Sequence, residues 1–224
     1  MIRRIGVVIP ARDEEQLIAR CLTSVLDAAA AVDVPVDVLV VADGCLDSTV
    51  EITRSFRHVR VLEIESSNVG AARAAGTLDV LARGADWIAN TDADSVVPPN
   101  WLLSQLEWAA SGHDVVVGTV RPDFEELDPE QVEAWQRGHT PGQPNGHVHG
   151  ANLGVRASVF EAVGGYRHLA EHEDVDLVAR LSNFAIVASD DAEVITSGRR
   201  FGRTPGGYAR YLREDLLRNA TIPT

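Results

Sequence analysis

Two hydrophobic periods alternate along residues 1–90, and this alternation constrains the fold more than any other feature of the sequence. Four short apolar runs have the residue types of buried strands, at 5–9, 36–41, 59–64 and 86–90. After the first run, Leu17, Cys21 and Val25 recur at helical spacing, and the acidic residues at 13–15 suit the first turn of that helix. Strands that alternate with helices predict βαβ units. We predict the α/β class, with a mostly parallel central sheet and helices on both faces.

The pattern is less regular beyond Thr91. Further strands are predicted at 114–120, 148–155 and 192–196, and further helices at 98–110, 157–163, 174–182 and 207–218. The segment 122–146 is acidic and rich in Pro and Gly, so we expect a mobile loop with one short helix at 129–137. No internal repeat or linker divides the 224 residues. We therefore predict one domain over 1–224.

Composition excludes several classes of function. The net charge of −13 disfavours nucleic acid as a partner, because phosphate binding needs clustered Lys and Arg. No apolar stretch approaches the roughly 18–20 residues of a membrane span, so we expect none. The two cysteines, Cys21 and Cys45, form neither a disulfide framework nor a metal motif. A soluble, cytoplasmic protein fits these features best.

Polar clusters follow each of the first four predicted strands. They lie at 10–12, 43–44, 66–68 and 91–94. The carboxyl ends of parallel strands share one edge of a sheet, and open α/β sheets bind ligands in the crevice beyond that edge. We therefore expect these four clusters to form one ligand site.

Asp92 and Asp94 are candidate metal ligands. They follow a buried strand, and no basic residue occurs in the ten positions after them, so the two carboxylates need a cation nearby. Oxygen ligands without thiolates favour Mg²⁺ or Mn²⁺ over Zn²⁺. The alternative is a purely structural role in the turn.

Asp174 is a candidate general base. Leu177, Val178 and Leu181 follow it at helical spacing, which places the carboxylate on the apolar face of the predicted helix. A carboxylate in that position needs a partner or a function, so the alternative is a hydrogen-bonded structural Asp. Asp176 is explained by an i,i+4 pair with Arg180.

Six motifs in order carry a resemblance to a known family. They are VVIPARDEE, VVADGCLDST, NVGAARAAG, WIANTDADSVVPPNWL, GANLGVRASVFEAVGGY and EHEDVDLVARL. From Val7 to Leu181 the chain resembles the family 2 glycosyltransferases with the GT-A fold. The resemblance implies an inverting transfer of a sugar from a nucleotide diphosphate donor, with Mg²⁺ or Mn²⁺ on the DxD motif.

The resemblance also implies roles for individual residues. By this resemblance, residues 1–94 are expected to form the nucleotide-binding half and residues 95–224 the acceptor-binding half. Contacts to the donor are implied for Pro10, Ala11, Arg12, Glu14, Asp43, Asn68, Arg73 and Asp92. Asp94 matches the metal-binding Asp, with Asp92 nearer the ribose or a metal-bound water, and Asp174 matches the catalytic base. Acceptor contacts are expected from His149, Asn152, Gly165, Tyr166 and Glu173.

Three further groups carry weaker expectations. His147 and His149 alternate along a predicted strand, so they share one face and suit acceptor or metal contact, or else a hydrogen-bonded pair. Arg199, Arg200 and Arg203 are the densest basic cluster, and they would either contact the diphosphate or balance the acidic surface. Three tryptophans are expected in the core, namely Trp87, Trp101 and Trp108. A fourth, Trp135, could stack on a sugar.

Other functions are compatible with such a sheet. A nucleotidyltransferase that makes a nucleotide sugar would usually need a Gly-rich phosphate loop after the first strand, and residues 10–14 lack glycine. A NAD-dependent dehydrogenase fails because no G-x-G-x-x-G motif follows that strand. A nucleotide-sugar or metal-binding module without catalysis is the non-enzymatic alternative. The sequence does not identify the acceptor, which could be a sugar, a small molecule or a lipid-linked group. It does not indicate the oligomeric state either.

Overall fold

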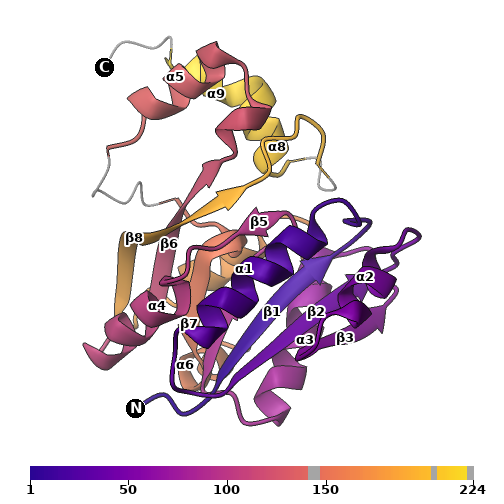
Figure 1. Ribbon diagram of the computed structural model, residues 1–224. Helices are drawn as coiled ribbons and strands as arrows, with labels where there is room; N and C mark the ends of the chain where they lie inside the picture. Colours follow the sequence, from indigo (N-terminus) through magenta and orange to yellow (C-terminus); the bar gives the residue numbers. More distant parts are fainter. Residues whose placement is uncertain (141–146, 203–205, 221–224) are drawn as a thin grey trace.

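One eight-stranded sheet runs through the molecule (Figure 1). The computed structural model describes residues 1–140, 147–202 and 206–220. The strands are β1 Ile5–Ala11, β2 Val36–Asp43, β3 Val59–Ile64, β4 Trp87–Asn90, β5 Ser95–Val96, β6 Val115–Pro122, β7 Leu153–Arg156 and β8 Ile186–Thr196. Their spatial order is β3-β2-β1-β4-β7-β6-β8-β5. Strands β3, β2, β1 and β4 are parallel, as are β6 and β8, whereas β7 is antiparallel to β4 and β6 and β5 is antiparallel to β8.

Helices cover both faces of this sheet. Helices α1 (Ile18–Ala30) and α4 (Trp101–Ala110) pack on one face, against Val7 and Ile9 of β1. Helices α3 (Val69–Ala82), α6 (Ala157–Ala162) and α7 (Glu173–Arg180) contribute to the core on the other face, which includes Val8. A short α2 (Thr49–Ser55) follows β2. Because both faces are covered, β1 is a continuous apolar run, and the predicted α/β class is confirmed.

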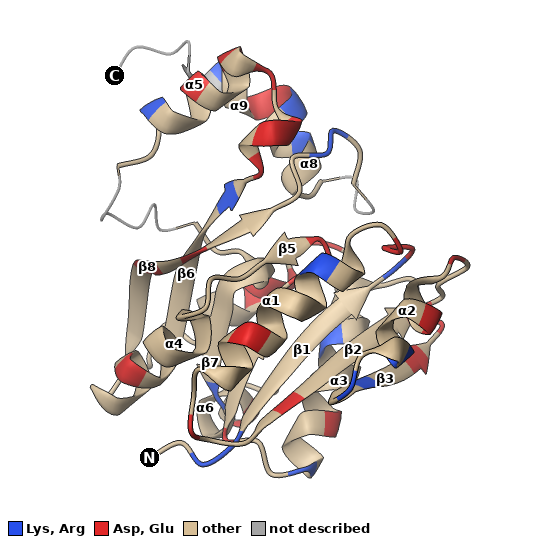
Figure 2. Ribbon diagram, in the orientation of Figure 1, with Lys and Arg blue, Asp and Glu red and all other residues tan. Residues whose placement is uncertain are grey.

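A smaller hydrophobic cluster lies beyond the ends of β6 and β8 (Figure 1). It joins α5 (Pro129–Arg137) to the C-terminal segment, which consists of α8 (Tyr208–Arg210), a π-helical turn at Tyr211–Asp215 and α9 (Leu216–Ala220). Trp135 is buried in this cluster with its ring against Phe124, so the prediction that it stacks on a sugar is not supported. The described part of the predicted mobile loop is folded, and its acidic residues lie on and before α5 (red in Figure 2). Residues 141–146 lie outside the described residues.

Several predicted elements differ from the structure: the strand predicted at 192–196 begins at Ile186, a π-helical turn divides the helix predicted at 207–218, and two others differ for local reasons. The predicted strand at 148–155 begins only at Leu153, because a 3₁₀ turn at Gly150–Asn152 precedes it and the Gly150 N–H donates to the Asp174 carboxylate instead of a strand. Helix α1 begins at Ile18, so the acidic residues at 13–15 precede it rather than form its first turn. Asp13 has a left-handed φ of 51°, and the Glu14 carbonyl accepts from the N–H groups of Leu17 and Ile18.

The tryptophan prediction holds for the sheet core. Trp87 and Trp101 are fully buried, and Trp108 is partly buried against the same cluster. Every helix in the described ranges is too short or too polar to span a bilayer.

Candidate active site

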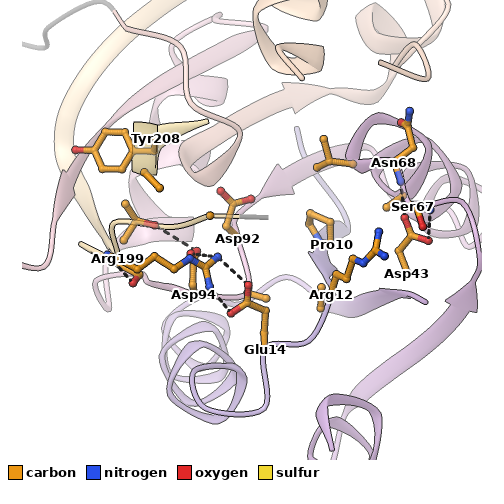
Figure 3. A pocket seen from close by; sticks show the side chains of 18 of the residues that line it. Pro10, Arg12, Glu14, Asp43, Ser67, Asn68, Asp92, Asp94, Arg199 and Tyr208 are labelled. Carbon is orange, nitrogen blue, oxygen red and sulfur yellow. Dashed lines mark hydrogen bonds and ion pairs between the residues drawn. The ribbon is translucent and has the colours of Figure 1, made fainter. Parts of the chain in front are cut away.

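A cavity of about 300 Å³ lies where β1, β2, β3 and β4 end (Figure 3). The turns that follow these strands and the segment after β8 supply its walls. Its lining includes nine of the residues predicted on the donor side, namely Pro10, Ala11, Arg12, Glu14, Asp43, Asn68, Asp92, Asp94 and Arg199. The structure therefore brings together residues that lie far apart in the sequence, such as Glu14 and Arg199, which are 185 positions apart.

Asp43 organises the loop between β3 and α3. One of its carboxylate oxygens accepts the N–H groups of Ser66 and Ser67, at 2.6 and 2.9 Å, and the other accepts the Ser66 hydroxyl and the Asn68 N–H, both at 2.8 Å. Burial acts to raise the pKa of Asp43, but these hydrogen bonds outweigh it and hold the pKa below its usual value. Asn68 in turn caps α3 by accepting from the Ala71 N–H at 2.9 Å.

Replacing Asp43 by asparagine should therefore destabilise the protein. We expect Asp43→Asn to lower the free energy of unfolding by about 2 kcal/mol at pH 7, because an amide accepts through one oxygen only and carries no charge. A carboxylate whose pKa is depressed on folding stabilises the protein above its unfolded pKa, and this contribution is lost as the pH falls through the folded pKa. Urea unfolding at pH 7 and pH 3 should show a smaller difference between wild type and variant at pH 3. The exposed Asp27→Asn serves as the control.

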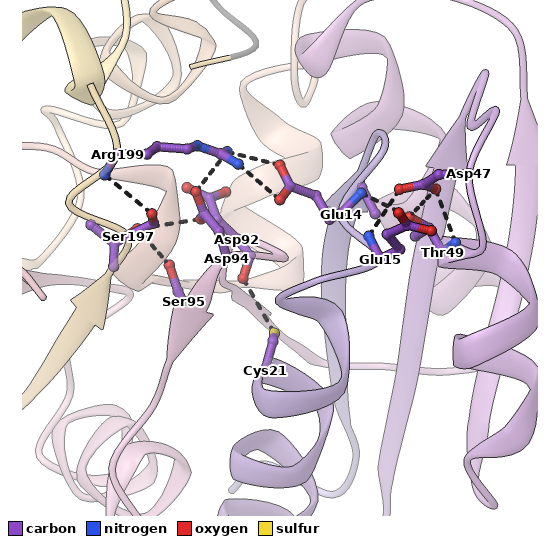
Figure 4. Close-up of polar contacts among 12 residues, drawn as sticks. Glu14, Glu15, Cys21, Asp47, Thr49, Asp92, Asp94, Ser95, Ser197 and Arg199 are labelled. Carbon is purple, nitrogen blue, oxygen red and sulfur yellow. Dashed lines mark hydrogen bonds and ion pairs between the residues drawn. The ribbon is translucent and has the colours of Figure 1, made fainter. Parts of the chain in front are cut away.

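Three charged side chains form a network at the floor of the cavity (Figure 4). Arg199 donates from Nη1 and Nη2 to the two oxygens of Glu14, at 2.9 and 2.8 Å, and its Nη2 lies 2.7 Å from Oδ2 of Asp94. The Thr196 hydroxyl donates to the other oxygen of Asp94 at 3.3 Å. Burial raises the pKa of Asp94 to about 7, and the neighbouring carboxylates of Asp92 and Glu14 act in the same direction against Arg199.

Arg73 connects this cavity to a second one. Its side chain is only 2% exposed and bridges two carboxylates, with Nη2 at 2.5 Å from Asp92 and Nε at 2.9 Å from Glu173. Burial raises the pKa of Glu173, and Asp174 adds to this effect, whereas Arg73 opposes it. The Arg73 Nη1 atom has no hydrogen-bond partner within the part of the chain that the structure describes.

The second cavity has a volume of about 450 Å³ and contains Asp174. It shares Val69, Asp92, Thr196 and Tyr208 with the first cavity, so the two spaces adjoin. Asp174 lies in the first turn of α7, where its Oδ2 accepts the Gly150 N–H at 2.7 Å and its Oδ1 accepts the Val175 N–H at 2.8 Å. These bonds fix the orientation of the carboxylate at the wall of the cavity.

Histidine and tyrosine rings line the same cavity. The rings of His147 and His149 lie 6.2 Å apart, and His149 packs edge-on against Tyr208 at 5.5 Å. Tyr208 stacks on Tyr211 at 5.7 Å. Burial lowers the pKa of His149, which favours its neutral form. The two histidines do not lie on a strand as predicted, since His149 immediately precedes the 3₁₀ turn.

Several predicted residues lie elsewhere. The Asn152 side chain is buried, accepts from the Trp101 indole and donates to the carbonyls of Thr119 and Ala192, so the structure places it away from the lining of both cavities. Gly165 and Tyr166 lie outside the residues that line the two cavities as described. Arg200 is paired with Asp128 at the start of α5 rather than directed at the donor side, and Arg203 lies outside the described residues.

Sequence reasoning missed other lining residues. Thr196, Ser197 and Tyr208 come from β8 and the segment after it, which returns to the sheet edge. Glu171 and His172 precede α7, and His172 adopts a left-handed φ of 60°. For Thr196, Ser197 and Tyr208, the signal in the sequence was that they lie close along the chain to the arginine cluster at 199–203.

Candidate metal ligands do not gather into a preformed cage. In the described ranges, the one group of three potential ligands within 4.8 Å of one another is Asp13, Cys45 and Asp47. The two carboxylates of this group hold local turns, because Asp13 accepts the Leu46 N–H and Asp47 accepts the Thr49 N–H.

The fold and the cavity define the class of the protein. An α/β sheet with a cavity beyond the carboxyl ends of its parallel strands has the usual ligand-binding arrangement of open α/β proteins. The chain belongs to the family described as glycosyl transferase family 2, which matches residues 6–164. The resemblance found in the sequence is thereby confirmed.

Individual relatives agree with this assignment. The chain is 29% identical, over 96% of its length and 67% of the relative, to the undecaprenyl-phosphate 4-deoxy-4-formamido-L-arabinose transferase of Pectobacterium carotovorum subsp. carotovorum (strain PC1).

Solved structures show the same GT-A fold. TarS 1–349 of S. aureus in complex with UDP-GlcNAc superposes with a TM-score of 0.68 and 16% identity, over 98% of this chain and 68% of that one. The mannosyltransferase PcManGT of Pyrobaculum calidifontis, in complex with GDP-Man and Mn²⁺, gives 0.62 and 18%, over 98% and 73%. In another TarS 1–349 structure the chain spans only 60% of that protein.

Proposed function

We propose that this protein transfers a sugar from a nucleotide diphosphate donor to an acceptor hydroxyl, with inversion at the anomeric carbon. The observation that carries the proposal is the pair of adjoining cavities, which meet at Asp92. The predicted donor residues line the first cavity and Asp174 lines the second. A direct displacement needs this separation, because the acceptor must attack from the side opposite the leaving diphosphate. Residues 1–94 would supply most of the donor site and 95–224 most of the acceptor site.

Asp94, with Asp92, is the proposed holder of a divalent cation. The donor set fits Mg²⁺ or Mn²⁺, because the carboxylates of Glu14 and Asp94 already converge on one cationic group. A divalent cation, when bound, would stabilise the negative charge that develops on the leaving diphosphate. The complex of PcManGT with GDP-Man and Mn²⁺ supports this assignment.

Asp174 is the proposed general base. A single inverting displacement needs one base to take the proton of the attacking hydroxyl. The Asp174 carboxylate is held by two backbone N–H groups at the cavity wall, which orients it without neutralising it. The neighbouring Glu173 is committed to Arg73, so we assign it to positioning rather than to proton transfer.

Donor turnover tests this function directly. Incubation with UDP-, GDP- and dTDP-sugars in the presence of Mn²⁺ and simple glycosides should release one nucleoside diphosphate, and the product should carry the inverted anomeric configuration by NMR. Formation of a nucleotide sugar with release of pyrophosphate would instead support the nucleotidyltransferase alternative. Tight binding of a nucleotide sugar without any release would support a binding module.

The second cavity also favours an uncharged acceptor. Its described lining contains four carboxylates, those of Asp92, Glu171, Glu173 and Asp174. The guanidinium of Arg73 is already paired with two of them, and burial favours neutral His149. A phosphate group would therefore meet mainly negative charge.

We accordingly expect neutral sugars to be preferred over their phosphorylated forms. Pairs that differ only by a phosphate, such as glucose and glucose 6-phosphate or mannose and mannose 6-phosphate, should be compared as acceptors by mass spectrometry. Transfer to the phosphorylated members alone would contradict this expectation.

The two thiols, Cys21 and Cys45, form no disulfide, which agrees with a proposed location in the reducing cytoplasm.

A further inference from the structure

Arg199 fills the place where the proposed cation would bind. Its guanidinium contacts three carboxylate oxygens, two from Glu14 and one from Asp94, at 2.7 to 2.9 Å (Figures 3 and 4). Its side chain is 27% exposed, and those of Glu14 and Asp94 are 7% and 13% exposed. The backbone N–H of Arg199 donates to the Ser197 hydroxyl at 3.2 Å, which positions the start of the loop after β8.

The guanidinium of Arg199 neutralises part of the negative charge of the carboxylates that line the first cavity. Glu14, Asp92 and Asp94 all line the first cavity, and their like charges repel one another unless a positive group lies between them. Arg73 balances Asp92 from the side of the second cavity. Arg199 is therefore the positive partner that Asp94 and Glu14 share.

A divalent cation and Arg199 compete for the same oxygens. Cation coordination by Asp94 uses the oxygen that now accepts the guanidinium, and the same guanidinium also holds the neighbouring Glu14 carboxylate. A released guanidinium that stays in the cavity lies close to the bound cation, and another anion is needed to offset the repulsion between the two positive charges. The diphosphate of the donor would be such an anion, because guanidinium and phosphate groups form strong charge-assisted hydrogen bonds.

We propose that Arg199 is a built-in counter-ion that occupies the cation position of the ligand-free protein and leaves Asp94 and Glu14 when the cation and the nucleotide diphosphate bind together. Cation binding alone is then weak, and the nucleotide strengthens it by giving Arg199 a new partner. The inference rests on the proposed role of Asp94 as a metal ligand, and it adds an exchange of partners within this chain.

Direct measurement of Mn²⁺ binding tests the exchange. Free Mn²⁺ is followed by electron paramagnetic resonance in the wild type, Arg199→Gln and Asp94→Asn, each with and without UDP or GDP. Without nucleotide, Arg199→Gln should bind Mn²⁺ about tenfold or more tightly than the wild type, within the usual range for coupled binding events. Nucleotide should strengthen Mn²⁺ binding more in the wild type than in Arg199→Gln.

Arg60 provides a matched control. It also bridges two carboxylates, Asp37 and Asp79, and its side chain is 28% exposed, but it lies on β3 away from the cavity lining. Arg60→Gln makes the same change in charge and should leave Mn²⁺ binding at the wild-type value. Thermal unfolding of both variants verifies that each is folded at the temperature of the titration.

The possible outcomes separate this inference from the proposed function. Equal Mn²⁺ affinity in the wild type and Arg199→Gln, with binding lost in Asp94→Asn, would overturn the counter-ion role and leave the metal site intact. Mn²⁺ binding that persists unchanged in Asp94→Asn would refute the metal site itself. An Arg199→Gln variant that binds no Mn²⁺ under any condition would also overturn the inference, because removal of the guanidinium would then have opened no site.

Discussion

Replacement of Asp174 by asparagine should lower the rate of sugar transfer by about 10²–10⁴-fold, the usual contribution of a positioned general base. The amide is nearly isosteric and its carbonyl oxygen can still accept the Gly150 N–H, but it cannot take a proton from the acceptor. Asp174 lines the second cavity and is not among the described residues that line the first. Nucleotide affinity should therefore stay near the wild-type value when it is measured by calorimetry.

The same helix offers a control for this variant. Asp176→Asn makes the same chemical change two residues later, at a carboxylate paired with Arg180 and Arg167 instead of facing a cavity. Its rate of nucleoside diphosphate release should remain within a few-fold of the wild type. An Asp174→Asn variant that transfers sugar at the wild-type rate would contradict the assignment of the base.

Loss of the Arg73 guanidinium should cause the largest change in stability. Arg73→Met should lower the free energy of unfolding by about 3–5 kcal/mol, because it leaves the carboxylate of Glu173 buried without its cation and removes one partner of Asp92. Urea unfolding at pH 7 measures this change. Arg3→Met is the control, since Arg3 pairs with Asp86 at the surface and should contribute no more than about 1 kcal/mol. A loss in Arg73→Met as small as that of the control would show that the buried bridge is not stabilising.

The parts of the fold that could be predicted are those whose hydrophobic pattern and turn residues lie within one short segment of the sequence. Strand β3 spans the predicted 59–64 and α5 the predicted 129–137, because each is an apolar or capped segment with clear turn residues at its ends. Asn152 could not be placed in this way. Its partners, Trp101 and the carbonyls of Thr119 and Ala192, lie 33 to 51 positions away, and only the assembled sheet brings them together.

The site was predictable where it depends on the ends of strands. The carboxyl ends of the parallel strands β1 to β4 carry their polar residues to one edge of the sheet, and eight of the predicted residues at these strand ends line the first cavity. The C-terminal contribution was not predictable at the same level. Arg199 and Arg200 are neighbours with equal chemistry, yet one pairs with Asp94 in the cavity and the other with Asp128 outside it.

Calorimetric titration of UDP, GDP and dTDP, each with and without Mn²⁺, shows whether the first cavity binds the nucleotide of the donor. The wild type should bind one of these nucleotides, more tightly with Mn²⁺ than without it, and Asp94→Ala should lose the Mn²⁺-dependent part of the binding. This result would establish the first cavity as the donor site and would identify the nucleotide base of the donor. Failure of the wild type to bind any of the three nucleotides, with or without Mn²⁺, would contradict the assignment of the first cavity to the donor.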